Sequence, residues 1–288
     1  MNATLNPDFS IEPDAVVVGV DGTETAVRAA IWAAAEARLR DTALHILHAA
    51  PYATNPTGRR HASGILGRAR TAARHSAPGL DVHTVSSLLS PVAALVAAGE
   101  QADLLVLGLI TGGSPAEPVL GSVTPAVSLH ARCPVVVVHG SHPTGGGAAP
   151  VVVGVHTAGV DAAALDAAFA DAARHRSALV AVHGGSGDAT REQLADALAP
   201  WRERFPQVQV ECLAMRGHPR DALLDAARTA RLVVVGGHRR SAPARILFGS
   251  VSRDVLRLSP VPVEIVRRGS PDPHAAVAMA VAPVSEDG

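Results

Sequence analysis

Apolar runs alternate with amphipathic stretches along this chain of 288 residues. The run at 15–20 is followed by residues 23–40, in which Val27, Ile31 and Ala34 share one face of a helix. Thr23 stands where the N-cap of that helix is expected. For the first half of the chain, the pattern predicts strands over 15–20, 43–50, 81–89, 103–109 and 133–139, and helices over 23–40, 64–75, 91–101 and from Ser122 onward.

The second half of the chain repeats the first half at two constant offsets. Gly108, Gly121-Ser122 and Pro134 recur 128 positions later as Gly236, Gly249-Ser250 and Pro262. The stretch VVVGVD at 16–21 recurs 135 positions later as VVVGVH at 151–156, and His48 recurs as His183. Two offsets indicate two copies of one unit, with 7 extra residues in the first copy. The Pro-, Gly- and Arg-rich segment 51–64 predicts a surface insertion.

Each copy alternates strands with helices, which predicts an α/β fold of two tandem, doubly wound parallel sheets of five strands each. In the second copy, TREQLADALAPWRERF at 190–205 predicts the second helix. The Gly- and Pro-rich segment 139–150 is typical of a flexible linker. The sequence therefore predicts domains at 14–140 and 150–268, followed by a C-terminal tail at 269–288.

The composition narrows the class of protein. Hydrophobic residues make up 48% of the chain and aromatic residues 2%, so the core must be built from Val, Leu, Ile and Ala. Such a core suits parallel strands that are covered on both faces. The net charge of −1 predicts no general attraction to nucleic acid or to an anionic membrane. All 25 basic residues are Arg, which excludes a Walker-type lysine loop, Schiff-base catalysis and a pyridoxal phosphate site.

The sequence also predicts a cytoplasmic location. The N-terminus lacks a basic region followed by an apolar stretch, and no apolar run reaches the ~20 residues of a membrane span. Cys133 and Cys212 lie in or beside apolar runs, which favours buried thiols in a reducing compartment.

A ligand site is expected beyond the carboxyl ends of the strands, where the strand order of an open parallel sheet reverses. Each copy places a Gly-Ser pair at a helix start near that point, and free N–H groups there attract phosphate. Hydroxyl groups could bind the same anion, or they could only cap the helix. The hydroxyl-bearing residues concerned are Ser122, Thr124, Ser250 and Ser252.

Over 14–267, the chain resembles the universal stress protein family, specifically its tandem-domain members. The family's fingerprint is Gly, two residues, Gly, nine residues, Gly, then Ser or Thr, and it lies here between two apolar strands. The resemblance implies a Rossmann-like fold of the adenine nucleotide alpha hydrolase type and binding of ATP or another adenine nucleotide, with Mg²⁺ held largely by phosphate oxygens and water. Copy one matches at Asp21, Gly108, Gly121 and Ser122, and copy two at Gly236, Gly249 and Ser250.

Both copies depart from the family's pattern. Thr111 and Arg239 replace the second glycine of the fingerprint, and His156 stands where the first-strand acid belongs. A glycine at that position allows close approach of the backbone to phosphate, whereas the Arg239 side chain could bind phosphate directly. The nucleotide-binding residues expected from position and resemblance are Asp21, Ala49, Gly108, Thr111, Gly121, Ser122, Thr124, His156, Gly236, Arg239, Gly249, Ser250 and Ser252.

Three functions are compatible with these residues. The first is a nucleotide-binding switch or sensor of the stress response without efficient turnover. The second is a degenerate scaffold with empty pockets that acts through protein contacts. The third is slow ATP hydrolysis, although no positioned general base or metal-binding carboxylate pair is visible in the sequence. Nucleic-acid binding by the Arg-rich loop is disfavoured because aromatic stacking partners are absent nearby.

Two further expectations concern assembly and metal. The fifth strands, at 133–139 and 261–267, are expected to pair within the chain as a pseudo-dimer, and a further homodimer is open. In copy two, a histidine follows each of the first four strands. These residues predict either a transition-metal or anion site or a set of scattered surface histidines. They are His156, His183, His218 and His238.

Overall fold

The computed structural model describes residues 9–109, 121–139, 149–156, 161–185, 191–237 and 249–267. In the first copy, its elements are β1 (Val16–Gly19), α1 (Glu24–Leu39), β2 (Leu44–Ala49), α2 (Pro56–Ser76), β3 (Val82–Ser87), α3 (Pro91–Ala98), β4 (Leu104–Gly108), α4 (Val123–His130) and β5 (Val135–Val138). In the second copy, they are β6 (Val151–Gly154), α5 (Ala162–Arg174), β7 (Leu179–Gly185), α6 (Arg191–Ala197), α7 (Ala199–Arg204), β8 (Val210–Arg216), α8 (Pro219–Ala227), β9 (Leu232–Gly237), α9 (Ser250–Leu258) and β10 (Val263–Arg267).

Two helices differ from the sequence prediction. The segment 51–64, predicted as a surface insertion, is mostly exposed, but its residues from Pro56 onward form the first turns of α2, so this helix begins before the predicted start at 64. Asn55 caps this helix by accepting a hydrogen bond from the N–H of Gly58 at 2.9 Å, and Pro56 suits the first helical position. The single helix expected at 190–205 is divided into α6 and α7. Pro200 lies in the first turn of α7, and a proline interrupts a helix that would continue through it.

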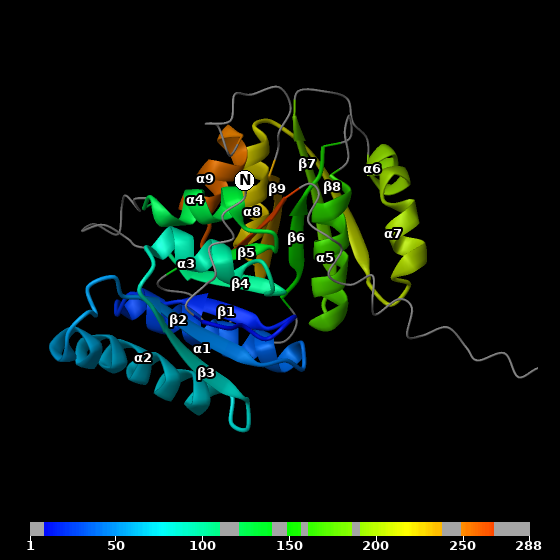
Figure 1. Ribbon diagram of the computed structural model, residues 1–288. Coiled ribbons are helices and arrows are strands. Elements are labelled where there is room, and N and C mark those ends of the chain that lie inside the picture. Colours follow the sequence, from blue (N-terminus) through cyan, green and yellow to red (C-terminus); the bar gives the residue numbers. More distant parts are fainter. Residues whose placement is uncertain are drawn as a thin grey trace, which may run out of the picture.

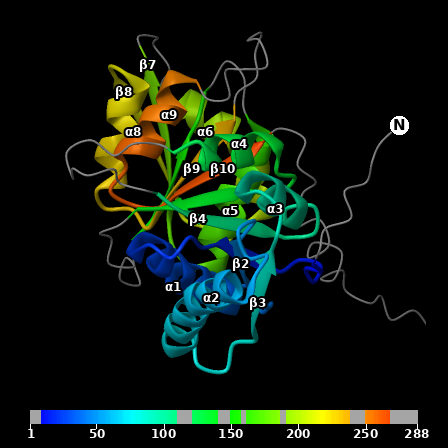
Figure 2. The same cartoon turned by 60° about the vertical axis from the view of Figure 1, so that its left-hand side comes forward.

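The strands form one ten-stranded sheet in the order β3-β2-β1-β4-β5-β10-β9-β6-β7-β8 (Figure 1). All neighbours within a copy are parallel, while β5 and β10 pair in antiparallel fashion, with Val136 opposite Glu264. The expected pairing of the fifth strands within the chain is therefore present. Helices cover both faces of the sheet in each copy, as the turned view also shows (Figure 2).

The core consists almost entirely of Val, Ala, Leu and Ile, as the composition requires. Apolar clusters on the two faces of the first copy lie under α1 with α2 and under α3 with α4. Across the junction, Leu109 and Val137 of the first copy join a cluster of the second copy. Trp32 packs against clusters of both copies. Apolar packing is therefore continuous from one copy to the other.

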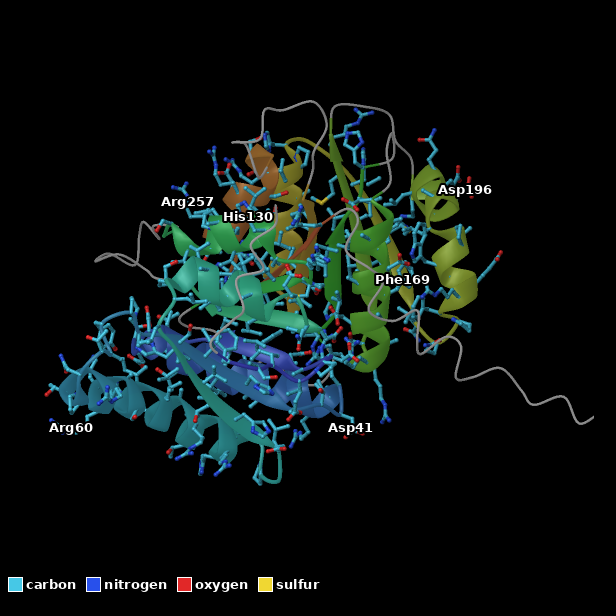
Figure 3. All side chains as sticks on the ribbon, viewed as in Figure 1. Asp41, Arg60, His130, Phe169, Asp196 and Arg257 are labelled. Carbon is cyan, nitrogen blue, oxygen red and sulfur yellow. The ribbon has the colours of Figure 1, made fainter. Side chains whose placement is uncertain are left out.

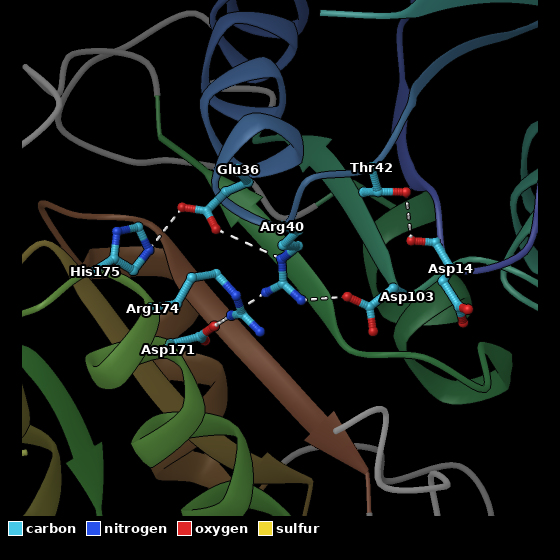
Figure 4. A network of polar contacts seen from close by, with 8 residues as sticks. All are labelled: Asp14, Glu36, Arg40, Thr42, Asp103, Asp171, Arg174 and His175. Atoms are coloured by element: carbon cyan, nitrogen blue, oxygen red, sulfur yellow. Dashed lines mark hydrogen bonds and ion pairs between the residues drawn. The ribbon is translucent and has the colours of Figure 1, made fainter. Parts of the chain in front are cut away.

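A buried ion network links α1 to α5 across the junction (Figure 4). Arg40 contacts Asp171 of the second copy at 3.1 Å, and His175 contacts Glu36 of the first copy at 2.9 Å. Glu36 and Asp171 stand 135 positions apart, as do Arg40 and His175. Each copy therefore supplies an acid to a base of the other. Asp103 completes the surroundings of Arg40 from the first copy.

Glu264 of β10 brings a further carboxyl group into this buried network. Burial and the neighbouring Asp171 raise the pKa of Glu264 well above its ordinary value of 4.5. Burial alone would also raise the pKa of Asp171, but a hydrogen bond from Glu264 and the charges of Arg40 and Arg174 lower it. The buried oxygens Glu264 Oε2 and Asp171 Oδ2 have no hydrogen-bond partner among the described residues when the carboxyl groups carry no proton. A proton on Glu264 allows this carboxyl group to donate a hydrogen bond to Asp171.

Replacement of Arg40 by Met should lower the free energy of unfolding by about 3–5 kcal/mol, because it leaves buried carboxylates without their cation. Arg28→Met is the control. Arg28 pairs with Glu24 on the exposed side of α1, where such a pair contributes about 0.3–0.5 kcal/mol. Chemical denaturation measures both. A loss no larger for Arg40→Met than for Arg28→Met would show that the network contributes little.

The raised pKa of Glu264 sets the sign of a pH dependence. In the unfolded chain Glu264 ionises near 4.5, whereas in the folded chain it keeps its proton to higher pH. The folded state then binds more protons, so stability falls as pH rises through this window. Glu264→Gln should remove this contribution, so its stability relative to wild type should increase between pH 5 and pH 8. A difference between variant and wild type that stays constant with pH contradicts the assignment.

Candidate functional site

Each copy contains a cavity of about 270 Å³ at the carboxyl ends of its strands, where the strand order reverses. In the first copy this point lies between β1 and β4, and in the second copy between β6 and β9. Both volumes lie just below the ~300–1,000 Å³ usual for ligand pockets. This is where parallel α/β sheets hold their ligands.

The first cavity is lined by the described residues that the sequence predicted as the ligand site of copy one. The ends of β1, β2 and β4 meet the start of α4, and α3 adds an apolar wall with Leu95. The expected residues that line this cavity are Asp21, Ala49, Gly108, Gly121, Ser122 and Thr124.

A tight turn holds Asp21 at the mouth of this cavity. Its Oδ1 accepts hydrogen bonds from the backbone N–H of Thr23 at 2.9 Å and from the Thr23 hydroxyl at 2.6 Å. Gly22 between them has φ 91°, which side-chain-bearing residues rarely adopt. The Thr23 hydroxyl in turn accepts from Ala26 N–H at 3.2 Å and caps α1, as predicted.

The start of α4 differs from the other helix starts of the first copy. Ser90 caps α3 by accepting from Ala93 N–H at 3.4 Å, whereas Ser122 makes no side-chain cap bond to α4. An added Cβ at Gly121 would meet nothing within 4 Å. The start of α4 lines the cavity, and within the described residues no side chain caps its first N–H groups, which are of the kind that attracts anions.

Close packing explains the glycine at the end of β4. A Cβ on Gly108 would lie 3.0 Å from the carbonyl oxygen of Thr25, so the first turn of α1 approaches the strand because no side chain intervenes. The fingerprint glycine thus has a packing role as well as a place in the cavity wall.

His48 is a cavity residue that the sequence did not single out as a site residue. Its Nδ1 lies 2.7 Å from the carbonyl oxygen of Val20, so that nitrogen donates, and its Nε2 accepts from the Tyr52 hydroxyl at 2.8 Å. His183 repeats the first contact in the second copy, 3.0 Å from the oxygen of Val155. Because this histidine recurs 135 positions later as His183, the repeat could have identified it as a site residue from the sequence.

The second cavity is lined by the described residues that the sequence predicted as the ligand site of copy two, but its carboxylate lies at a different position. Asp161 also lines it and stands 135 positions after Ala26 of the first cavity. A Cβ on Gly236 would lie 2.2 Å from Asp161 Oδ2, so this side chain occupies space beside the fingerprint glycine. The sequence prediction missed Asp161, although the repeat offset could have indicated it. The expected residues that line this cavity are His156, Gly236, Gly249, Ser250 and Ser252.

Two histidines of the group predicted in copy two make hydrogen bonds to the backbone. His218 caps α8 by accepting from Arg220 N–H at 3.2 Å, and His183 ties β7 to β6 as described above. The rings of His156 and His183 lie 6.1 Å apart. His238 lies outside the described residues, as do Thr111 and Arg239, so these parts of the expected sites remain predictions.

Comparisons with known proteins define the class. The model of the Universal stress protein family matches residues 13–139 and 149–267. The chain therefore belongs to this family. Universal stress protein Rv2005c of Mycobacterium tuberculosis is 32% identical over 88% of this chain and 97% of its own length. Universal stress protein Rv2623 of the same organism is 31% identical, with 88% and 96% covered.

Solved structures agree on the fold. A universal stress protein from Archaeoglobus fulgidus matches with a TM-score of 0.73 at 17% identity, over 90% of this chain and 100% of its own. Another universal stress protein, solved in complex with cAMP, is 30% identical and covers 46% of this chain and 100% of its own, with a TM-score of 0.38. No described helix is both long enough and apolar enough to cross a bilayer.

Two serines separate the capping and ligand-binding interpretations of the helix starts. Ser90→Ala removes a cap from α3 and should cost about 1 kcal/mol of unfolding free energy. Ser122→Ala removes no cap bond from α4 and should change stability by less than about 0.5 kcal/mol. Denaturant titration of both variants measures the difference. Equal losses would mean that Ser122 acts as a cap.

Proposed function

We propose that the protein binds ATP or another adenine nucleotide and acts in the cytoplasm as a switch or sensor of the stress response without efficient turnover. One observation carries the proposal. Asp21, Ala49 and Ser122, from three separate segments, line one cavity that the uncapped start of α4 faces. We also propose that 14–140 and 150–268 act as domains and 269–288 as a tail.

The chemistry of the first cavity supports a nucleotide with its phosphates at α4. The N–H groups at the start of that helix and the Ser122 hydroxyl are donors suited to phosphate oxygens. The Asp21 carboxylate is an acceptor suited to a ribose hydroxyl, as the family resemblance implies. Leu47, Leu95 and Leu107 supply the apolar wall that a purine ring requires.

The same cavity offers little for hydrolysis. Among the described residues that line it, Asp21 is the sole carboxylate, and the two ring nitrogens of His48 both take part in hydrogen bonds. A general base needs a free nitrogen or oxygen within reach of the attacking water. Mg²⁺ would enter with the triphosphate, held by phosphate oxygens and water rather than by a protein carboxylate pair. These features favour retention of the ligand over turnover.

The second cavity is proposed as the weaker phosphate site. Asp161 Oδ2 occupies the space beside Gly236, the first glycine of the fingerprint, which leaves less room for a phosphate there. The first cavity has Ala26 at that position. Copy one is therefore favoured for the whole nucleotide, whereas the sequence alone favours copy one for the sugar contact and copy two for the phosphates, through Arg239, which lies outside the described residues.

Nucleotide binding is tested by mass spectrometry of the ligand released from freshly purified protein and by calorimetric titration of the emptied protein with ATP. Asp21→Asn keeps an acceptor for Thr23 but removes the charge, and it should weaken ATP binding at least tenfold, since a hydrogen bond to a charged group is worth about 1.5–3 kcal/mol. Ser122→Ala should weaken it roughly threefold to tenfold.

The matched controls are Asp196→Ala on α6, whose side chain lies on the outer side of the molecule (Figure 3), and Ser63→Ala on the exposed side of α2. Both should bind ATP as wild type does. A purified protein that carries no nucleotide and ignores added ATP would favour the scaffold function instead.

The asymmetry between the cavities is tested with Asp161→Asn. If this acid disfavours phosphate in copy two, the variant should bind additional ATP per chain or bind it more tightly, whereas the Asp21→Asn variant should retain only the weaker site. Calorimetric stoichiometry distinguishes these cases. If Asp161→Asn binds ATP with unchanged stoichiometry and affinity, Asp161 does not weaken phosphate binding in the second cavity.

A further inference from the structure

Two histidines lie side by side at one edge of the sheet, away from both cavities. His45 of β2 and His83 of β3 are register partners, and their rings are stacked with centroids 4.9 Å apart. Each is the second residue of its strand, so the pair lies near the amino ends of the strands. At ~3.3 Å per residue, His45 is roughly 13 Å from the Ala49 end of β2. β3 is the outermost strand of the sheet (Figure 2).

His45 is a buried polar group whose ring has no hydrogen-bond partner among the described residues. Its residue surface is 4% exposed, and neither ring nitrogen makes a hydrogen bond within the described part of the chain. Buried polar groups in folded proteins are nearly always satisfied, so this one requires an explanation. His48, three residues along the same strand, has both ring nitrogens bonded. Burial of His45 alone therefore does not account for its lack of partners.

Carboxylates approach the two histidines from outside the sheet. Glu12 Oε1 lies 3.6 Å from His83 Nε2, and Asp81 Oδ2 lies 3.1 Å from the same nitrogen without the geometry of a hydrogen bond. The segment that carries Glu12 is anchored, because Ile11 is buried and Ala15 N–H donates to the Glu12 carbonyl at 3.3 Å. The carboxylate is thus held near the rings by its backbone.

The ligand atoms already lie close together. One nitrogen from each histidine and one Glu12 oxygen lie within 4.8 Å of one another, the only such group of three among the described residues. Metal bonds of ~2.0–2.2 Å in tetrahedral geometry need ligand atoms roughly 3.3–3.5 Å apart. Glu12 is exposed and His83 half-buried, so small side-chain rotations suffice to close the site.

We propose that Glu12, His45 and His83 bind a divalent transition metal ion such as Zn²⁺, with Asp81 or water in the fourth position. Two imidazoles with a carboxylate suit zinc, nickel, cobalt or copper rather than magnesium or calcium. Burial and the adjacent His83 lower the pKa of His45, which favours the neutral ring that binds metal. The bound ion would fasten the segment before β1 to the edge strand β3.

The test is titration of the chelator-treated full-length protein with Zn²⁺ against a chromophoric chelator, repeated with Co²⁺ to read tetrahedral coordination from its visible spectrum. His83→Gln and Glu12→Gln alter partly or fully exposed side chains and should each weaken Zn²⁺ binding at least tenfold and abolish the Co²⁺ bands. His45→Gln should do the same, and if it fails to fold, the other two variants decide.

Two controls locate the metal. His75→Gln, on the exposed face of α2, should bind Zn²⁺ as wild type does, and so should His156→Ala from the second cavity. Equal Zn²⁺ affinity in wild type, His83→Gln and Glu12→Gln overturns the proposal. Loss of binding in His156→Ala alone also overturns it and assigns the metal to the histidines of copy two. ATP binding by the Zn²⁺-site variants should be unchanged, which separates this site from the nucleotide cavity.

Discussion

The junction between the copies depends on buried charges that the two copies neutralise together, with partners from both sides of the junction. Arg40 meets Asp171, and Glu36 meets His175, so each helix completes the other. Removing such ions from water costs several kcal/mol per ion, and the cost is recovered only when both partners arrive in the right geometry. The network therefore favours a docking of α1 on α5 that is compatible with the pairing of β5 with β10 in one ten-stranded sheet.

This alignment has consequences for chemistry. Because the copies are related by an antiparallel junction, their two cavities lie at separate places and share no lining residue. Each cavity is built from its own strand ends and helix start, so a substitution in one leaves the other intact. Asp21 and Ala26 in the first cavity, against His156 and Asp161 in the second, show that the walls have diverged while the scaffold has not.

The strands, the duplication and the position of the cavities could be predicted from the sequence, because each depends on local periodicity or on a constant offset. The ion network could not, since Arg40 and Asp171 are 131 residues apart and nothing local pairs them. Asp161 was missed because α5 begins later than α1 relative to the repeat. The contact of His45 with His83 depends on strand register, which the sequence pattern leaves open.

The pairing of β5 with β10 within one chain distinguishes this protein from a dimer of identical subunits. Two identical subunits that associate through these strands must carry two identical pockets and must find one another at a rate set by their concentration. A chain that contains both halves need not carry identical pockets, and its halves associate independently of concentration. It holds two dissimilar sites in a fixed one-to-one ratio at any dilution, so one site can retain an inherited ligand while its twin acquires another specificity.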